Sequence, residues 1–351
     1  MKLSRIINAS GKMTILGGSK VDASVADQMV YGAQNLFLME ELIEVSGQHI
    51  ADLFGVEAAS VVASASAGIA QAVASVISND HVLDPYNTNN VRRNIIMPKG
   101  HNVDYGTTIA LPIQMGGGVV VEAGYANACS LDHVESKIDE NTAALLFVKS
   151  HHTVQKGMPD LKGFIDLGHK YGLSVIVDAA AEGDVAYYHH LGADAVIYSG
   201  TKTFEGPTSG VVIGTHEFIR NLRHQSKGIG RVMKVGKEGI LGLVQALDNH
   251  FAHEDVSLSD QQKRLELFHS AFEGILKSRN VQDGAGRPIL RCELTFSSSD
   301  EANRIVNHLK SGDVKIYTRD YCANEGIIEL DIRDLSDDEM KEIVVAIKEG
   351  L

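Results

Sequence analysis

Hydrophobic and polar positions follow more than one pattern along the 351-residue chain. From about residue 58 to residue 214, short runs of apolar, mostly β-branched residues alternate with longer amphipathic stretches. The short runs predict buried strands, and the longer stretches predict helices. The predicted strands of this region are residues 60–63, 94–97, 119–122, 144–148, 173–177, 195–198 and 211–213, and its predicted helices are residues 66–77, 130–138 and 160–171.

Strands that alternate with helices are typical of a mainly parallel sheet with helices on both faces. The sequence therefore predicts an α/β fold for residues 56–255. In such sheets ligands bind outside the carboxyl ends of the strands. The residues that directly follow each predicted strand are therefore the first candidates for function.

The two ends of the chain are patterned differently. Residues 1–55 are expected to form an arm and two helices, at about 21–29 and 38–54, that pack on a neighbouring domain or subunit. After residue 213 the pattern turns helical, at 217–226, 234–250 and 259–278. Residues 256–351 are predicted to form a small α+β domain. Its expected strands are 288–296, 314–318 and 327–332, and its later helices are 300–310 and 336–348.

Composition and charge exclude several classes of protein. No apolar run approaches the roughly 18 residues that a membrane span needs, and no signal peptide is expected at the N-terminus. The net charge of −13 disfavours nucleic acid as the main partner. Cys129, Cys292 and Cys322 form no closely spaced pair, which suits a reducing cytoplasm and argues against a structural zinc site.

A lysine in a turn of small residues is the candidate for a reactive group. Lys202 ends Ser199-Gly200-Thr201-Lys202, between two predicted strands, and the following Gly206, Pro207 and Gly210 exclude a helix. A lysine in such a place, taken alone, is more often a solvated residue at a strand end. The alternative is a nucleophilic amine of lowered pKa that can form a Schiff base.

Two further strand ends add the groups that a cofactor needs. Asp178 follows the apolar strand 173–177, and a crossover between adjacent parallel strands brings it and Lys202 to one crevice. The small residues 64–68, SASAG, open a predicted helix whose backbone N–H groups can bind an anion, although small residues also permit tight packing. An amine, a carboxylate and an anion cradle are together what pyridoxal phosphate requires, and Ser199 can contact its phosphate.

Histidines follow two other strands. His101 comes just after the strand 94–97, where its ring could stack on an aromatic ring or transfer protons; the alternative is an ordinary loop histidine. Lys149, Ser150, His151 and His152 follow the strand 144–148. Adjacent residues on an extended chain point in opposite directions and no carboxylate accompanies them, so substrate contact or local hydrogen bonding is favoured and no metal is expected.

The combination resembles the fold-type I pyridoxal phosphate enzymes and, among them, the bacterial selenocysteine synthase family. The resemblance covers most of the chain and implies the fold-type I transferase architecture. Thr201, Phe204 and Glu205 depart from the residues usual in that family, and the closer similarity is to its shorter, D-glucosaminate-6-phosphate ammonia-lyase-like members. The segments that carry the resemblance are residues 7–11, 64–68, 199–202, 206–210 and 230–234, together with Asp178.

The resemblance implies pyridoxal 5'-phosphate held as a Schiff base on Lys202, with Asp178 at the ring nitrogen. It implies an ammonia-lyase that eliminates water from a 2-amino-3-hydroxy sugar acid such as D-glucosaminate 6-phosphate, giving a 2-keto-3-deoxy acid and ammonia. Lys202 and Asp178 are then the catalytic residues. The other expected cofactor contacts are Ser66, Ala67, Gly68, His101, Ser199 and Gly206.

The substrate anion has four candidate partners: Arg231, Lys149, Arg333 and His151. An arginine fork suits a carboxylate or a phosphate, and an ordinary surface ion pair is the alternative for each. The alternative functions are a selenocysteine synthase-like transferase, an aminotransferase and a non-catalytic relative. The expected partners are a small amino sugar acid and further copies of the chain in a homodimer or larger homo-oligomer, with no nucleic acid and no membrane, in the cytoplasm.

Overall fold

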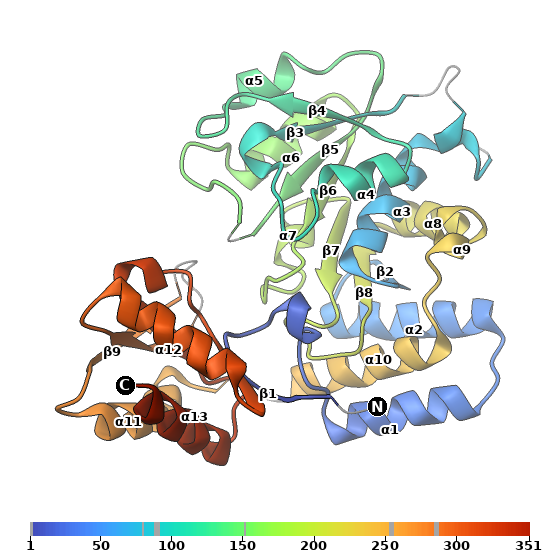
Figure 1. Cartoon of the computed structure of the whole chain (residues 1–351). Coiled ribbons are helices and arrows are strands. Elements are labelled where there is room, and N and C mark those ends of the chain that lie inside the picture. The colour runs from blue at the N-terminus through green and yellow to red at the C-terminus, as the bar shows by residue number, and fades with distance from the viewer. Residues whose placement is uncertain (1–2, 79–80, 88–91, 151, 253–255, 284–287) are drawn as a thin grey trace. The chain divides into compact units, whose positions relative to one another are not determined.

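The computed structural model describes residues 3–78, 81–87, 92–150, 152–252, 256–283 and 288–351 (Figure 1). The chain divides into two units. The large unit is Val21–His253, and the C-terminal unit joins Met1–Lys20 to Glu254–Leu351. The arm expected at residues 1–55 is thus shared between the two units.

A seven-stranded sheet forms the centre of the large unit, in the order β2-β8-β7-β6-β5-β3-β4 (Figure 1). Its neighbours from β7 to β4 are parallel, whereas β8 runs antiparallel to both β7 and β2. This confirms the predicted mainly parallel sheet. The strands are β2 (Ala58–Val62), β3 (Asn94–Pro98), β4 (Val119–Ala123), β5 (Thr142–Val148), β6 (Ser174–Asp178), β7 (Ala195–Ser199) and β8 (Gly210–Gly214).

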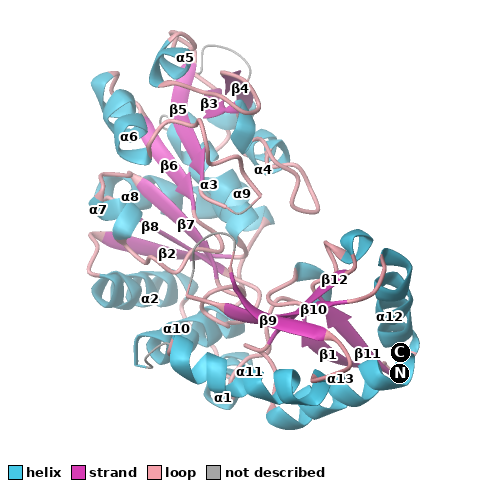
Figure 2. Ribbon diagram, turned by 90° about the vertical axis from the view of Figure 1, so that its left-hand side faces the viewer, coloured by secondary structure: helices cyan, strands magenta, loops and turns pink. Residues whose placement is uncertain are grey.

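Both faces of this sheet are buried, because alternate residues of each strand point to opposite sides. Leu145 and Phe147 of β5 belong to one core cluster, and Leu146 and Val148 belong to another. Figure 2 shows α6 on one side of the sheet and α4 on the other. The first face is covered by α2 (Met39–Phe54), α5 (Leu131–Glu135), α6 (Leu161–Lys170), α7 (Tyr187–His190) and α10 (Lys237–Ala252), and the second by α3 (Ala65–Ile77), α4 (Ala110–Met115) and α8 (His216–His224).

The helices of this unit differ from the expectations in several places: α4 and α7 were not predicted, and two others differ in extent or position. The first, α1 (Ala23–Gln34), begins at the N-cap Asp22, whose side chain accepts a hydrogen bond from Ser24 N, and runs further than the predicted helix 21–29. The second, α9 (Ile229–Val232), is a short turn that fills the gap between two predicted helices. Among the described residues, no helix is both long and apolar enough to cross a membrane.

The C-terminal unit has its own core under α11 (Leu258–Phe272), α12 (Ser299–Ser311) and α13 (Asp337–Gly350). Its antiparallel sheet has the order β12-β10-β9, and β1 (Arg5–Ala9) pairs in parallel with β11 (Val314–Thr318). The other strands are β9 (Lys277–Gln282), β10 (Leu290–Thr295) and β12 (Ile327–Asp331).

The predicted helix 259–278 was too long at its C-terminal end, because its last residues belong to the strand β9. Gly274 has a φ of +72°, a left-handed conformation in which a helix commonly stops. Beyond it β9 is an edge strand that pairs only with β10 among the described strands. Its polar residues gave no strand pattern, because an edge strand has less apolar surface to bury.

Candidate active site

Three neighbouring strands bring their carboxyl ends together at one edge of the large sheet. Asp178 is the last residue of β6, and its Cα is paired with Val148 of β5 and with Ile197 of β7. Past these pairs, Lys149 N donates a hydrogen bond to Asp178 O at 2.8 Å, and Ala179 N donates one to Ile197 O at 2.9 Å. The segments that follow β5, β6 and β7 therefore all leave from this edge.

The turn that carries Lys202 is closed by its own backbone. Gly200 N donates to Ser209 O at 2.9 Å, and Gly206 N donates to Gly200 O at 2.7 Å. A Cβ on Gly200 would overlap the hydroxyl of Ser209, so glycine is required there. Ser199 is buried, its Oγ lies 3.2 Å from Thr201 Oγ1, and Lys202 is half-buried. The turn thus presents the lysine from a fixed base.

Asp178 and Lys202 interact electrostatically. Asp178 is only 8% exposed, and burial raises its pKa to about 6, against the opposing effects of the Lys202 charge and of a hydrogen bond from Ala180 N at 3.1 Å to Oδ1. In the chain by itself, the Lys202 charge and this hydrogen bond therefore offset only part of the cost of burying the ionised Asp178 carboxylate. A cation next to it would favour the ionised form.

The small-residue turn before α3 is the expected anion cradle. Ser64 caps the helix, accepting from Ala67 N at 3.0 Å through its side chain and from Gly68 N at 2.9 Å through its carbonyl. The N–H groups that have no partner within the helix are thus those of its first residues, Ala65 and Ser66. Ala67 and Gly68 were both expected as cofactor contacts, but their N–H groups already donate hydrogen bonds to Ser64.

This cradle is pressed against the strand that follows the lysine turn. A Cβ on Gly210 would lie 2.7 Å from the Ser64 carbonyl carbon, and one on Gly68 would lie 3.0 Å from Ile197 Cγ2. A hollow of about 270 Å³ opens beside the cradle. It is lined by Ala63, Ser64, Ser66, Ala67, Tyr105, Thr107, Leu111, Pro112, Met115 and Met233.

These residues fit pyridoxal phosphate. Lys202 supplies an amine, Asp178 supplies a buried carboxyl group that gains from a cationic ring nitrogen, and the start of α3 supplies N–H groups and hydroxyls for a phosphate. Because Gly210 and Gly68 have no side chains, the strands β7 and β8 on either side of the lysine turn can lie close to the cradle. When bound, the cofactor would be held by Lys202, Asp178 and Ser66.

His101 is fully buried, and its ring meets Phe147 edge-on with 4.4 Å between ring centroids. Burial lowers its pKa to about 4, so the ring is neutral at neutral pH. Nδ1 accepts from Val148 N at 3.3 Å, and Nε2 makes no hydrogen bond to the described residues. This unsatisfied nitrogen keeps His101 a predicted cofactor contact, but neighbouring side chains must shift to expose it.

The loop after β5 contributes a histidine that the sequence left without a role. His151, expected as a substrate contact, lies outside the described residues. The pKa of His152 is lowered by burial and then by the positive charge of Lys202, which places His152 near the lysine. Lys149 donates from Nζ to Gln155 Oε1 at 3.2 Å, so its candidate role as a substrate contact competes with this bond. The sequence did indicate this loop, because Lys149 and His152 both follow the predicted strand 144–148.

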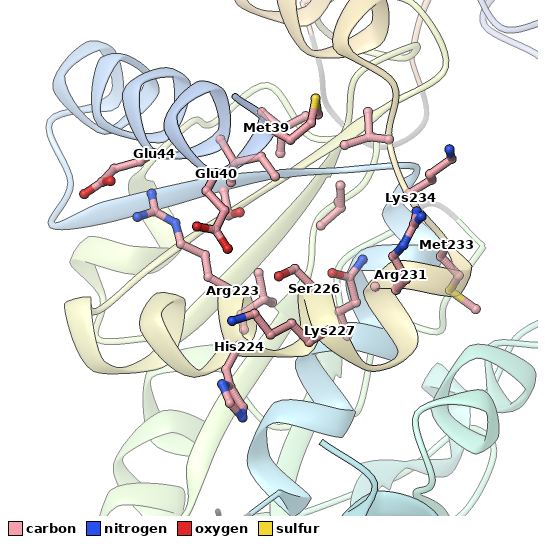
Figure 3. A pocket seen from close by; sticks show the side chains of 18 of the residues that line it. Met39, Glu40, Glu44, Arg223, His224, Ser226, Lys227, Arg231, Met233 and Lys234 are labelled. Atoms are coloured by element: carbon pink, nitrogen blue, oxygen red, sulfur yellow. The ribbon is translucent and has the colours of Figure 1, made fainter. Parts of the chain in front are cut away.

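Arg231 of α9 lines a different cavity, of about 1250 Å³, and among its described lining residues are neither Lys202 nor Asp178. Figure 3 shows Arg231, Met233 and Lys234 at one end of this cavity and Arg223 with Glu40 and Glu44 at the other. Met233 also lines the hollow beside Ser64. The segment 230–234 therefore runs between the cavity of about 1250 Å³ and the cradle at the start of α3.

Arg333 belongs to the C-terminal unit. Its guanidinium donates from Nε to Asp331 Oδ1 at 2.9 Å and from Nη2 to Asp331 Oδ2 at 2.8 Å. A bidentate pair of this kind is a strong one, and it holds the side chain in place. Arg333 remains a predicted substrate contact that would have to bind through its remaining donors.

Known proteins resemble the chain over most of its length. The family model described as "SelA: L-seryl-tRNA selenium transferase" matches residues 40–279. A D-glucosaminate-6-phosphate ammonia lyase from Salmonella typhimurium is 38% identical over 99% of this chain and 95% of its own length. A 5'-C-glycyluridine monooxygenase-decarboxylase from Streptomyces is 36% identical over 99% and 90%. An L-seryl-tRNA(Sec) selenium transferase from Aquifex aeolicus is 25% identical over 78% and 66%.

Solved structures also resemble the chain over most of its length. A structure of D-glucosaminate-6-phosphate ammonia-lyase superimposes with a TM-score of 0.92 and 39% identity, covering 99% of this chain and 96% of that one. A serine palmitoyltransferase from Sphingomonas wittichii has a TM-score of 0.61 at 12% identity, covering 98% and 86%. The second likeness concerns the fold alone, and it confirms the expected fold-type I architecture.

The raised pKa of Asp178 makes the stability of the cofactor-free protein depend on pH. Its pKa of about 6 lies above the usual value near 4, so its contribution to stability is present below about pH 4 and is lost as pH rises through about 6. Asp178→Asn removes this titration. The free energy of unfolding of the variant minus that of the wild-type protein should therefore be about 1–3 kcal/mol larger at pH 7.5 than at pH 4.

Urea unfolding of cofactor-free wild-type and Asp178→Asn proteins at the two pH values measures this difference. The matched control is Asp166→Asn, which removes an exposed acid of α6 and should show no such dependence. An equal effect of Asp178→Asn at both pH values would contradict the burial argument.

Proposed function

Since the chain belongs to the SelA family, we propose that it is a pyridoxal phosphate-dependent ammonia-lyase acting on a 2-amino-3-hydroxy sugar acid. The observation that carries the proposal is the meeting of Lys202, Asp178 and the α3 cradle at one sheet edge. The substrate class is supported by the ammonia lyase at 38% identity and by its solved structure at a TM-score of 0.92. D-glucosaminate 6-phosphate is the first substrate to test.

The bound cofactor supplies an electron sink for the charge that develops at the substrate's α-carbon. Asp178 would hold the ring nitrogen of the bound cofactor, and its carboxylate would favour protonation of that nitrogen. The amine of Lys202 removes the α-proton and returns it to the departing β-hydroxyl, which leaves as water. The resulting enamine takes up one water and yields the 2-keto-3-deoxy acid and ammonia, so the overall reaction consumes and releases equal amounts of water.

The turn and the neighbouring histidine serve the proton transfer. The backbone bonds around Gly200 and Gly206 fix the base of Lys202, so its amine returns to the same place after each transfer. Burial and the nearby Lys202 lower the pKa of His152, so at neutral pH this ring carries no charge that would oppose protonation of the lysine.

A second relative makes the reaction type worth testing directly. The 5'-C-glycyluridine monooxygenase-decarboxylase is 36% identical, nearly as similar as the ammonia lyase. The lyase is favoured because it is also matched by a solved structure at 39% identity. The selenium transferase alternative is less supported, with 25% identity over 78% of the chain.

Lys202→Ala should abolish the visible absorbance of lysine-bound cofactor and lower ammonia release by at least about 100-fold, because the base is gone. Ammonia and 2-keto acid are measured with a panel of phosphorylated and unphosphorylated 2-amino sugar acids, and oxygen uptake is followed in parallel. Lys202→Arg is the matched control, since it keeps the positive charge beside Asp178 but not the amine, and it should also be inactive.

Two results would overturn this function. One is full turnover by Lys202→Ala. The other is wild-type activity that consumes oxygen and releases no ammonia from any member of the panel.

We propose Arg231 as the main partner of the substrate anion, with Lys149, Arg333 and His151 as further candidates. Arg231→Ala should raise KM for the phosphorylated substrate by about 10- to 100-fold while leaving the unphosphorylated analogue within about twofold. Lys227→Ala, which removes another cation from the same cavity, is the control. Equal KM changes for the two substrates would assign Arg231 to the carboxylate instead, and no change would exclude it.

We also propose that the chain works as a homodimer or a larger homo-oligomer. The support is a group of exposed apolar residues around the α1–α2 connection, where such a surface is typical of an interface. Its members are Val30, Tyr31, Leu36, Leu38, Met39 and Val45, between 38% and 94% exposed.

Sedimentation velocity should give at least twice the 37.8 kDa of one chain, and Leu36→Asp with Leu38→Asp should lower the mass toward a monomer. A wild-type monomer at micromolar concentration would contradict this arrangement.

The free state of all three cysteines supports a cytoplasmic location, which cell fractionation checks.

A further inference from the structure

Tyr105 lies at the mouth of the α3 cradle. Its hydroxyl oxygen is 2.9 Å from Ser66 Oγ, in the first turn of the helix. Tyr105 also lines the hollow of about 270 Å³ together with Ser64, Ser66 and Ala67. A residue from a loop far along the chain thus completes the wall of the predicted phosphate site.

A small hairpin fixes the position of this tyrosine. Asp104 and Thr108 form an antiparallel bridge, and Tyr105 N donates to Thr107 O at 3.0 Å. Gly106 has a φ of +104°, and its N–H donates to Asp104 Oδ1 at 2.7 Å. The ring packs against the core cluster on the α3 face of the sheet. The hydroxyl is therefore held in place before any ligand arrives.

The hydroxyls of Tyr105 and Ser66 together have one donor to spare. Each carries one O–H group, and the bond between them uses one of the two. Burial raises the pKa of Tyr105, and the negative charges of Asp178 and Asp104 raise it further, so the phenol stays protonated at neutral pH. The remaining O–H and the N–H groups of Ala65 and Ser66 are all donors, which suits a phosphate and not a cation.

We propose that Tyr105 donates a hydrogen bond to the phosphate of pyridoxal phosphate and shares that phosphate with Ser66. This inference rests on the proposed function for the cofactor itself. It assigns a cofactor-binding residue that no strand-end pattern indicates. The alternative source of the same chemistry is the phosphate of a phosphorylated sugar acid, and the experiment separates the two.

The test compares two ligands that differ only in the phosphate. Dissociation constants of pyridoxal phosphate and of unphosphorylated pyridoxal are measured by equilibrium dialysis with cofactor-stripped full-length protein. In Tyr105→Phe the dissociation constant for pyridoxal phosphate should rise about 10- to 100-fold, the range expected for a hydrogen bond to a charged group. The constant for pyridoxal should stay within about twofold.

Three further variants sharpen the comparison. Ser66→Ala should weaken pyridoxal phosphate selectively as well, and the double variant should lose less than the product of the two single effects, because the hydroxyls act as a pair. Tyr171→Phe is the matched control, since it removes a tyrosine hydroxyl that donates to Glu135 Oε1 at 2.6 Å, away from the hollow, and it should change neither constant.

Each other result overturns the assignment. Equal weakening of both ligands by Tyr105→Phe would show a contact with the ring or a loss of packing. Unchanged cofactor binding with a raised KM for only the phosphorylated substrate would assign Tyr105 to the sugar phosphate. Wild-type protein that binds neither pyridoxal ligand would overturn the proposed function too, whereas normal wild-type binding with an unchanged ratio in the variants would overturn the Tyr105 assignment alone.

Discussion

The backbone of β8 begins against the first turn of α3 with no room for a side chain between them. At Gly210 a Cβ would lie 2.7 Å from the Ser64 carbonyl carbon, closer than such atoms can approach. This contact joins the return of the lysine turn to the start of the anion cradle. Because β7 and β8 are paired along their length, holding Gly210 also holds the strand that leads into Lys202.

A second constraint comes from the burial of Asp178. An ionised carboxylate at the end of a strand with two paired neighbours loses most of its hydration, and one backbone N–H and the Lys202 charge restore only part of it. The fold therefore tolerates an acid whose pKa is raised to about 6. A cationic ring nitrogen would offset this cost, so a buried acid that is unfavourable in the free chain would become favourable with the cofactor bound.

Sequence patterns located the sheet and the two central site residues for one physical reason. The strands are buried on both faces, so they are nearly continuous apolar runs, and the polar residues that follow them stand out. The edge strand β9 buries little, so the pattern predicts a helix over its residues 277–278 and no element over the rest of it. Tyr105 lies in a hairpin without periodicity, and the cavity around Arg231 is built from α2, α8 and α9 together. Neither could be placed before the tertiary packing was known.

The pairing of β1 with β11 gives the chain an order of assembly. Ile7 and Ala9 are fully buried in the core of the C-terminal unit, beside a strand that ends at Thr318. During synthesis the apolar strand β1 therefore stays without its partner until β11 has been made. Residues 21–253 contain their whole sheet and can fold in the meantime. The residues of β1, which precede the whole large unit along the chain, thus find their place only after it has been made.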